Sequence, residues 1–150
     1  MHDTIIIGAG CAGLAAAMYA GRLNMKTILV GENIGGTIAL TDVVENYPGF
    51  IKLTGQELAD NLRKHAEAYN TEKSESKVTK IKREHSCFLV DTNEGKTYQS
   101  KTIIFATGTE WRKLNVPGEK EFANKGVHYC ALCDGAVYKN RIIALVGAGD

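Results

Sequence analysis

The chain has 150 residues, of which 44% are hydrophobic and 23% are charged, the size and composition of an ordinary globular domain. Its 18 Lys and Arg nearly balance its 17 Asp and Glu, and a formal charge of +1 without a basic stripe argues against a nucleic-acid partner. No apolar run approaches the roughly 18 residues of a membrane span. The amino end has no basic segment before its apolar run, so it lacks a signal-peptide pattern and predicts a cytoplasmic protein.

The first thirty residues predict a strand–helix–strand unit of a parallel, doubly wound sheet. Thr4–Ile7 is a β-branched apolar run that ends at a glycine. Ala12–Leu23 has apolar side chains at roughly helical spacing, and Lys26–Val30 follows as a second strand. Between the first strand and the helix stands Gly8-Ala9-Gly10-Cys11-Ala12-Gly13, which fits G-x-G-x-x-G in the context that this motif requires.

Each glycine of this motif has a physical reason in a dinucleotide site. The first allows a tight turn, the second lets the backbone approach a pyrophosphate, and the third lets helix and strand pack closely. The phosphates then meet free amides and the positive end of the helix dipole. An acidic residue about 20 residues further on usually binds a ribose hydroxyl, and Glu32 lies close to that position. A glycine-rich turn of an ordinary α/β protein is the alternative.

The middle of the chain predicts a long loop, a helix and a β-meander. Residues 31–53 are expected to be irregular, and so long a loop is usually functional or mobile. Thr54-Gly55-Gln56-Glu57 spells a capping box that opens a helix to about Tyr69. The meander is expected within residues 71–106, with strands at Val78–Ile81, Phe88–Thr92, Thr97–Gln99 and Thr102–Ala106 and a turn at Asn93-Glu94-Gly95.

The last forty residues predict a loop and then a second glycine turn. Residues 109–126 are loop-like, and Ile142–Val146 is expected to be a buried strand that runs into Gly147-Ala148-Gly149. Such a turn is useful only with a following helix, so we expect a fragment of a longer protein rather than a short protein with a glycine-rich tail. The predicted fold class is α/β: a Rossmann-like βαβ unit with an inserted β-meander, followed by the start of a second Rossmann-like domain.

Cys130-Ala131-Leu132-Cys133, followed by Asp134, is the segment that points most directly to a chemical activity. In a cytoplasmic chain a Cys-x-x-Cys pair is more often redox-active or metal-binding than structural. Two intervening residues let the sulfurs meet as the segment turns into a helix, and Asp134 could donate and accept the proton of the exchange. Zinc would need two further ligands; His128 is in reach, but a second Cys-x-x-Cys is missing. A chance buried pair is the other alternative.

The two remaining cysteines have simpler interpretations. Cys11 is expected to be a small buried side chain within the glycine turn. Cys87 adjoins the apolar run Phe88-Leu89-Val90, so we expect it to be a residue of a strand and not a nucleophile.

With these motifs in place, the chain resembles the low-molecular-weight thioredoxin reductase family, the class II FAD-dependent pyridine nucleotide-disulfide oxidoreductases. The matching segments occur in the family's order across essentially the whole chain: Gly8–Gly13, Gly35-Gly36, Val44-Glu45-Asn46-Tyr47-Pro48-Gly49, Thr54-Gly55, Ala106-Thr107-Gly108 and Cys130-Ala131-Leu132-Cys133-Asp134-Gly135. Thr37 stands where the family usually has Gln, and Gly31 displaces the expected acid by one residue.

The resemblance implies the domains and the site residues. Residues 1–112 would be the first part of an FAD domain, and residues 113–150 the beginning of a pyridine-nucleotide domain that carries the redox disulfide. Cys133 would be the thiol nearer the flavin, Cys130 the thiol that attacks the partner disulfide, and Asp134 the acid–base group. The FAD-binding residues would be Gly8, Gly10, Cys11, Ala12, Gly13, Glu32, Gly35, Gly36, Thr37, Asn46, Thr107 and Gly108.

The implied function is a homodimeric flavoprotein that passes electrons from reduced FAD to the Cys130–Cys133 disulfide and on to thioredoxin. NADPH is the expected electron donor, with ferredoxin as the alternative. A peroxiredoxin-type partner or a small-molecule disulfide could replace thioredoxin. A flavin- or nucleotide-binding module without catalysis and a zinc-binding structural piece are the rivals from other classes.

Overall fold

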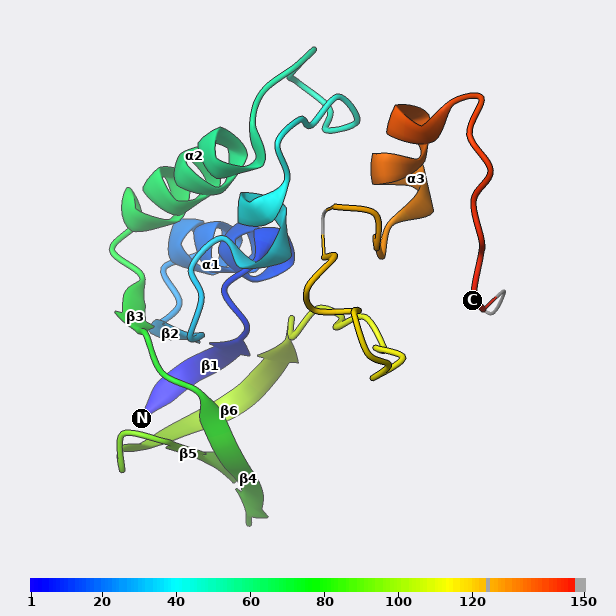
Figure 1. Ribbon diagram of the computed structural model, residues 1–150. Helices are drawn as coiled ribbons and strands as arrows, with labels where there is room; N and C mark the ends of the chain where they lie inside the picture. The colour runs from blue at the N-terminus through cyan, green and yellow to red at the C-terminus, as the bar shows by residue number, and fades with distance from the viewer. Residues whose placement is uncertain (124, 148–150) are drawn as a thin grey trace. The chain divides into compact units, whose positions relative to one another are not determined.

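The computed structural model describes residues 1–123 and 125–147, except for the side chains of Leu132, Cys133 and Ala136. The chain divides into two compact units, Met1–Gly108 and Thr109–Asp150 (Figure 1). None of the helices in these ranges is long and apolar enough to cross a membrane.

All six strands of the first unit belong to one sheet, in the order β3-β2-β1-β6-β5-β4 (Figure 1). The first four in that order pair in parallel, and β6, β5 and β4 pair antiparallel. β6 is therefore both a strand of the Rossmann-like half and the last strand of the predicted meander. The bounds of the strands are β1 (His2–Ile7), β2 (Thr27–Val30), β3 (Glu72–Ser74), β4 (Val78–Glu84), β5 (Cys87–Thr92) and β6 (Thr97–Phe105).

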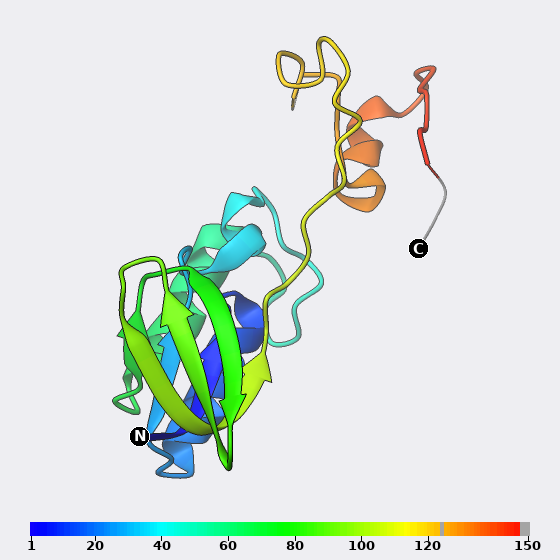
Figure 2. The same cartoon turned by 90° about the horizontal axis from the view of Figure 1, so that it is seen from below.

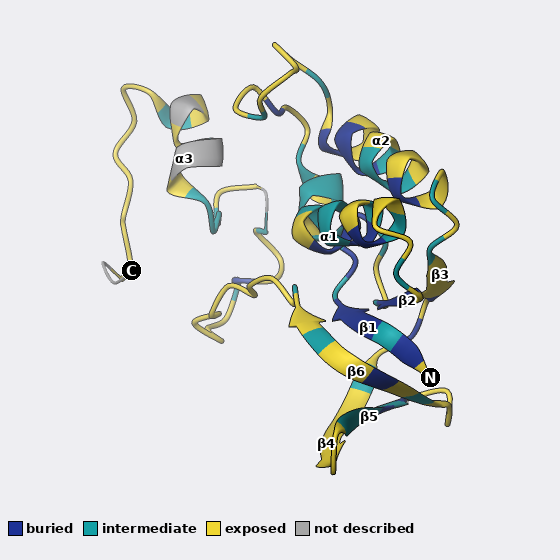
Figure 3. Cartoon of the chain, turned by 180° about the vertical axis from the view of Figure 1, so that it is seen from behind, coloured by how far each residue is buried: buried dark blue, intermediate teal, exposed yellow. Residues whose placement is uncertain are grey.

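The central strands are buried on both faces because each face has its own cover. The side chains that point to one face of the sheet, such as Ile6 and Leu29, pack against α1 (Cys11–Arg22) and α2 (Gly55–Glu67). The side chains that point to the opposite face, such as Ile5 and Ile28, form a second cluster with Val90 of the antiparallel strands. Figure 2 shows these antiparallel strands side by side, and Figure 3 shows the burial along β1 and β2. This arrangement explains why β1 and β2 are continuous apolar runs rather than alternating ones.

The capping box at the start of α2 is confirmed in both of its hydrogen bonds. The Glu57 amide donates to Thr54 Oγ1 at 3.1 Å, and the Thr54 amide donates to Glu57 Oε2 at 2.7 Å. The first of these bonds satisfies an amide that the helix itself leaves without a partner. The hydrogen bond that the Glu57 carboxylate accepts from the Thr54 amide holds the pKa of that carboxyl below its usual value.

The expected break between Thr97–Gln99 and Thr102–Ala106 is wrong, because β6 runs through it without interruption. The strand continues through polar Ser100 and Lys101 and only changes partner there. Ser100 is aligned with His2 of β1 on one side and with Phe88 of β5 on the other, and it is fully buried. Its hydroxyl donates to the Thr102 carbonyl at 2.8 Å, which removes the cost of burying it. β3, a three-residue edge strand rich in charge, was not predicted as a separate strand.

The expected buried strand at Ile142–Val146 is also wrong for this structure. The segment has no regular structure, and its large apolar side chains are exposed, Ile142 completely. The described part of the second unit contains a short helix, α3 (Ala131–Asp134), and a 3-10 helix, Gly135–Tyr138, but no strand with which the segment could pair. A parallel strand needs a neighbour for its backbone groups, so the apolar run stays outside a sheet.

Candidate functional site

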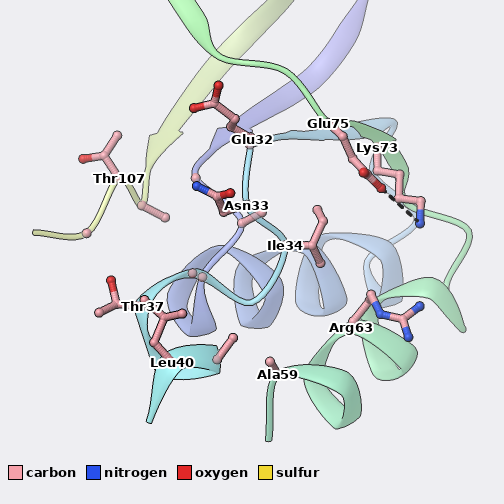
Figure 4. Close-up of a pocket in the computed structure, with 18 of the residues that line it drawn as sticks. Glu32, Asn33, Ile34, Thr37, Leu40, Ala59, Arg63, Lys73, Glu75 and Thr107 are labelled. Carbon is pink, nitrogen blue, oxygen red and sulfur yellow. Dashed lines mark ion pairs between the residues drawn. The ribbon is translucent and has the colours of Figure 1, made fainter. Parts of the chain in front are cut away.

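A cleft of about 870 Å³ opens at the carboxyl ends of β1, β2 and β6, within the first unit (Figure 4). This is the edge of a parallel sheet at which α/β proteins bind their ligands, and the volume suits a large organic cofactor. Gly8, Ala9 and Gly10 line the cleft after β1, residues 31–34 line it after β2, and residues 106–108 line it after β6. The helix α2 and the 3-10 helix Gly36–Leu40 complete the wall.

Gly8 and Gly13 are required by the packing of the protein itself. A Cβ on Gly8 would lie 2.1 Å from the Ala106 carbonyl oxygen, and its φ of +107° is in the region that favours glycine. A Cβ on Gly13 would lie 1.8 Å from the Gly8 carbonyl oxygen. These contacts place the turn tightly between α1 and β6, which is the role expected for the first and third glycines.

Gly10 has no such reason within the protein. Its nearest neighbours would be 3.9 Å from an added Cβ, and its φ of −80° is open to any residue. It lies at the N-cap of α1, where no side chain caps the helix and the first turn holds no acidic residue. The cleft therefore reaches the N-terminal end of this helix at Gly10, which leaves it open, and a helix N-terminus suits a phosphate group.

The other end of the cleft is lined by ionic side chains from α2 and β3. Arg63 is paired with Asp60 at 3.3 Å and with Glu67 at 3.2 Å, and Lys73 lies 2.9 Å from Glu67. The hydrogen bond from Lys73 lowers the pKa of the Glu67 carboxyl. Lys73 also pairs with Glu75 at 4.0 Å, and Figure 4 marks this ion pair with a dashed line. Because each cation here already has a carboxylate partner, this end has little net charge to offer a phosphate.

The structure brings seven of the twelve predicted cofactor residues to the cleft: Gly8, Gly10, Glu32, Gly36, Thr37, Thr107 and Gly108. Cys11, Ala12 and Gly13 lie in the first turn of α1, directly after the glycine turn, and are not among the described residues that line the cleft. Gly35 is buried, and its amide donates to the Ala9 carbonyl at 2.8 Å, so it fixes the loop that forms the wall. Asn46 is exposed on the loop before α2 and is not among the described residues that line the cleft.

Sequence reasoning missed the wall that α2 and β3 provide. Gln56, Ala59, Asp60 and Arg63 reach the cleft at helical spacing from one face of α2, and Lys73 and Glu75 reach it from the chain around β3. The spacing was visible, but a polar helix face normally faces solvent, so nothing in the sequence distinguished it. Asn33 and Ile34, which directly follow Glu32, could have been included from their position alone.

The cysteine motif lies in the second unit, at α3. Cys130 directly precedes the helix and takes part in a disulfide, and the Asp134 amide donates to the Cys130 carbonyl at 2.9 Å. The side chain of Cys133 lies outside the described residues. Asp134 is described, and its carboxyl oxygen Oδ2 lies 3.3 Å from His128 Nδ1. Among the described side chains there is no group of three residues that could hold a metal ion.

The other two cysteines are free thiols in the structure. Cys11 is half-buried rather than fully buried, and desolvation raises the pKa of its thiol, which keeps it protonated. Cys87 lies at the start of β5, as expected for a strand residue, and its sulfur donates to the Glu84 carbonyl at 3.2 Å.

Comparison with known proteins places this arrangement in a family. The sequence model described as pyridine nucleotide-disulphide oxidoreductase matches residues 2–150, and the chain belongs to that family. Thioredoxin reductase from Treponema pallidum is 42% identical over 99% of the chain and 49% of the relative, and the enzyme from Bacillus subtilis is 40% identical over 100% and 48%. The crystal structure of thioredoxin reductase from Streptococcus pyogenes matches with a TM-score of 0.81 at 41% identity, over 92% of this chain and 45% of the other.

These matches confirm the resemblance to the low-molecular-weight thioredoxin reductases and the Rossmann-like α/β fold. The chain spans about half the length of the curated relatives it matches.

Proposed function

We propose that this chain is the FAD-binding and dithiol-bearing part of a cytoplasmic, homodimeric thioredoxin reductase. The observation that carries the cofactor assignment is Gly10, a glycine that no contact among the described residues requires and that lines the cleft at the start of α1. A ligand that approaches the backbone closely is the remaining reason for a glycine there. The relatives named above are thioredoxin reductases, which supports thioredoxin as the disulfide substrate.

In this proposal the residues of the cleft bind and orient the dinucleotide. The amides at the start of α1 bind its pyrophosphate, and Glu32, at the end of β2, accepts from a ribose hydroxyl. Gly36, Thr37, Asn46, Thr107 and Gly108 are assigned to the flavin side. FAD supplies two-electron chemistry when it is bound.

The dithiol would perform the transfer to the substrate. Reduction of the Cys130–Cys133 disulfide yields two thiols, and the Cys130 thiolate attacks the substrate disulfide to form a mixed disulfide. Cys133 then attacks Cys130, which restores the intramolecular disulfide and releases the second substrate thiol. Asp134 supplies the proton that a leaving thiolate needs. NADPH is the donor that we assign, with ferredoxin as the alternative.

Gly10→Ala tests the cofactor assignment. The added methyl group fits without a clash, so the free energy of unfolding of the apoprotein should change by no more than about 1 kcal/mol. The same methyl group would stand where the pyrophosphate approaches, so FAD affinity should fall on the order of tenfold or more. Flavin absorbance and titration of the apoprotein with FAD, in the protein expressed at its full natural length, measure this. Wild-type affinity in Gly10→Ala would contradict the assignment.

Cys130→Ser and Cys133→Ser test the dithiol. Either change should abolish the reduction of thioredoxin while FAD stays bound, because exchange needs both sulfurs. Undiminished thioredoxin reduction by either variant would remove the basis of the proposal. If instead wild-type protein reduces a peroxiredoxin-type or small-molecule disulfide faster than thioredoxin, the chemistry stands and the substrate is reassigned.

A further inference from the structure

The His128 ring lies between the carboxyl group that ends the cysteine motif and a tyrosine hydroxyl. Nδ1 of His128 is 3.3 Å from Asp134 Oδ2, and its Nε2 is 2.8 Å from the Tyr138 hydroxyl, within hydrogen-bonding distance. The tyrosine ring also packs edge-on against the imidazole, with ring centroids 5.3 Å apart. The side chain of His128 is 20% exposed and that of Asp134 is 37% exposed, so the ring is the more buried partner of this pair.

When Asp134 is ionised, the hydrogen-bonding capacity of the three groups favours one tautomer of His128. A carboxylate only accepts hydrogen bonds, so the nitrogen that faces it must carry the hydrogen. In that tautomer His128 Nε2 accepts from the Tyr138 hydroxyl, 2.8 Å away, and this contact holds the orientation of the ring. Nδ1 is buried and, among the described residues, has no hydrogen-bond partner, since its contact with Asp134 is close but not aligned as a bond.

We propose that His128 is a positioning residue for Asp134 in thiol–disulfide exchange at Cys130. The imidazole holds the carboxyl group beside the cysteine motif and stabilises the carboxylate that remains after Asp134 has given up its proton. This inference rests on the proposed function, which assigns Asp134 the acid role. Asp134 and Tyr138 are the titratable groups in contact with His128 in the part of the chain that the structure describes.

The proton has a defined place in this exchange. The Cys130 thiolate forms a new S–S bond with one sulfur of the substrate disulfide, the substrate S–S bond breaks, and the leaving sulfur takes the electron pair. That sulfur then takes the proton from Asp134 when its thiolate is basic. A leaving thiolate that is stable without a proton has no need of Asp134 or of His128.

This difference gives an assay that uses neither flavin nor thioredoxin. The protein, expressed at its full natural length, is reduced with dithiothreitol and desalted, and its reaction with two disulfides is followed under single-turnover conditions. Oxidised glutathione releases a basic thiolate, and 5,5′-dithiobis(2-nitrobenzoate) releases a thiolate that is stable unprotonated. His128→Phe, which removes both polar contacts and keeps a ring, is measured alone and together with Asp134→Asn.

We expect His128→Phe to slow the reaction with oxidised glutathione about fivefold or more, and to change the rate with the aromatic disulfide by less than about twofold. In the Asp134→Asn background the same substitution should change either rate by less than about twofold, because the two residues act as one unit. Equal slowing with both disulfides, an equal effect in both backgrounds, or no effect with oxidised glutathione would overturn the proposal.

Two fallback variants and one control variant keep the test decisive. If His128→Phe fails to fold, as judged by circular dichroism, His128→Asn and Tyr138→Phe replace it. Each is measured with both disulfides, alone and together with Asp134→Asn, and judged by the same criteria. His65→Phe is the matched control, since His65 also contacts a tyrosine ring, Tyr69 at 5.9 Å, but lies far from the motif in sequence on the exposed face of α2. It should leave both rates unchanged. Because the reductant is chemical, a protein that binds no FAD or ignores thioredoxin would still give a clear answer on His128.

Discussion

Two apolar runs of this chain are similar in sequence and differ completely in structure. Thr4–Ile7 precedes Gly-Ala-Gly and forms the centre of the sheet, where Ile5 and Ile6 are fully buried. Ile142–Val146 precedes the same three residue types and has no regular structure. The first run has β2 on one side and β6 on the other, and the described part of the second unit offers no strand at all. An apolar run therefore specifies a buried strand only where the chain also supplies the neighbours.

The largest expected effect tests this contrast with one substitution at two sites. In the 150-residue chain, Ile6→Ala should lower the free energy of unfolding by about 2–5 kcal/mol, because it leaves a cavity between the sheet and α1. Ile143→Ala, at a position that is 64% exposed, should change it by less than about 0.5 kcal/mol. Urea unfolding followed by circular dichroism measures both. A cost at Ile143 close to that at Ile6 would show that the second run is buried in solution.

A smaller effect is expected at the start of α2, which opens on a capping box. Thr54→Ala removes the side-chain acceptor of the Glu57 amide and should cost about 1 kcal/mol of unfolding free energy. Thr54→Ser keeps the acceptor and is the control. Equal stability of the alanine and serine variants in urea would mean that the capping box contributes nothing measurable.

The smallest effect concerns the loop that begins the second unit. Hydrogen bonds from Tyr129 and from the amides of Leu114 and Asn115 hold the pKa of the Glu119 carboxyl below its usual value. The lowered pKa means that this stabilisation is present above the carboxyl's unfolded pKa and is lost as the pH falls through its folded pKa. Trp111, the single tryptophan, stacks on Tyr129 at 6.1 Å and reports the change by fluorescence.

The Glu119→Gln variant is the control for this titration, since an amide does not ionise in this range. We expect an acid transition in the Trp111 fluorescence of wild-type protein that the variant lacks. The same transition in both proteins would assign it to another group.

Much of the first unit could be predicted from the sequence because its signals are local. The strand, the glycine turn and the capping box each lie within a few residues, and the structure has the predicted strand–turn–helix and the capped helix in place. What could not be predicted depends on partners distant in sequence. The break expected after Gln99 does not occur, because β1 and β5 flank the strand at Ser100. Arg63 and Lys73 reach the cleft only because α2 packs against α1 and β3 pairs with β2.

The pairing of β1 with β6 also sets the order in which the sheet can form. Thr4 is aligned with Thr102 and Ile7 with Phe105, so one edge of the first strand waits for a partner that is made almost a hundred residues later. Contacts of such long separation slow folding, because a large loop must close before they contribute. During synthesis, β1, α1 and β2 can associate early, while the apolar edge of β1 remains unpaired until β6 has left the ribosome. We therefore expect late, cooperative closure of the sheet, with the exposed edge of β1 as the aggregation-prone feature of the nascent chain.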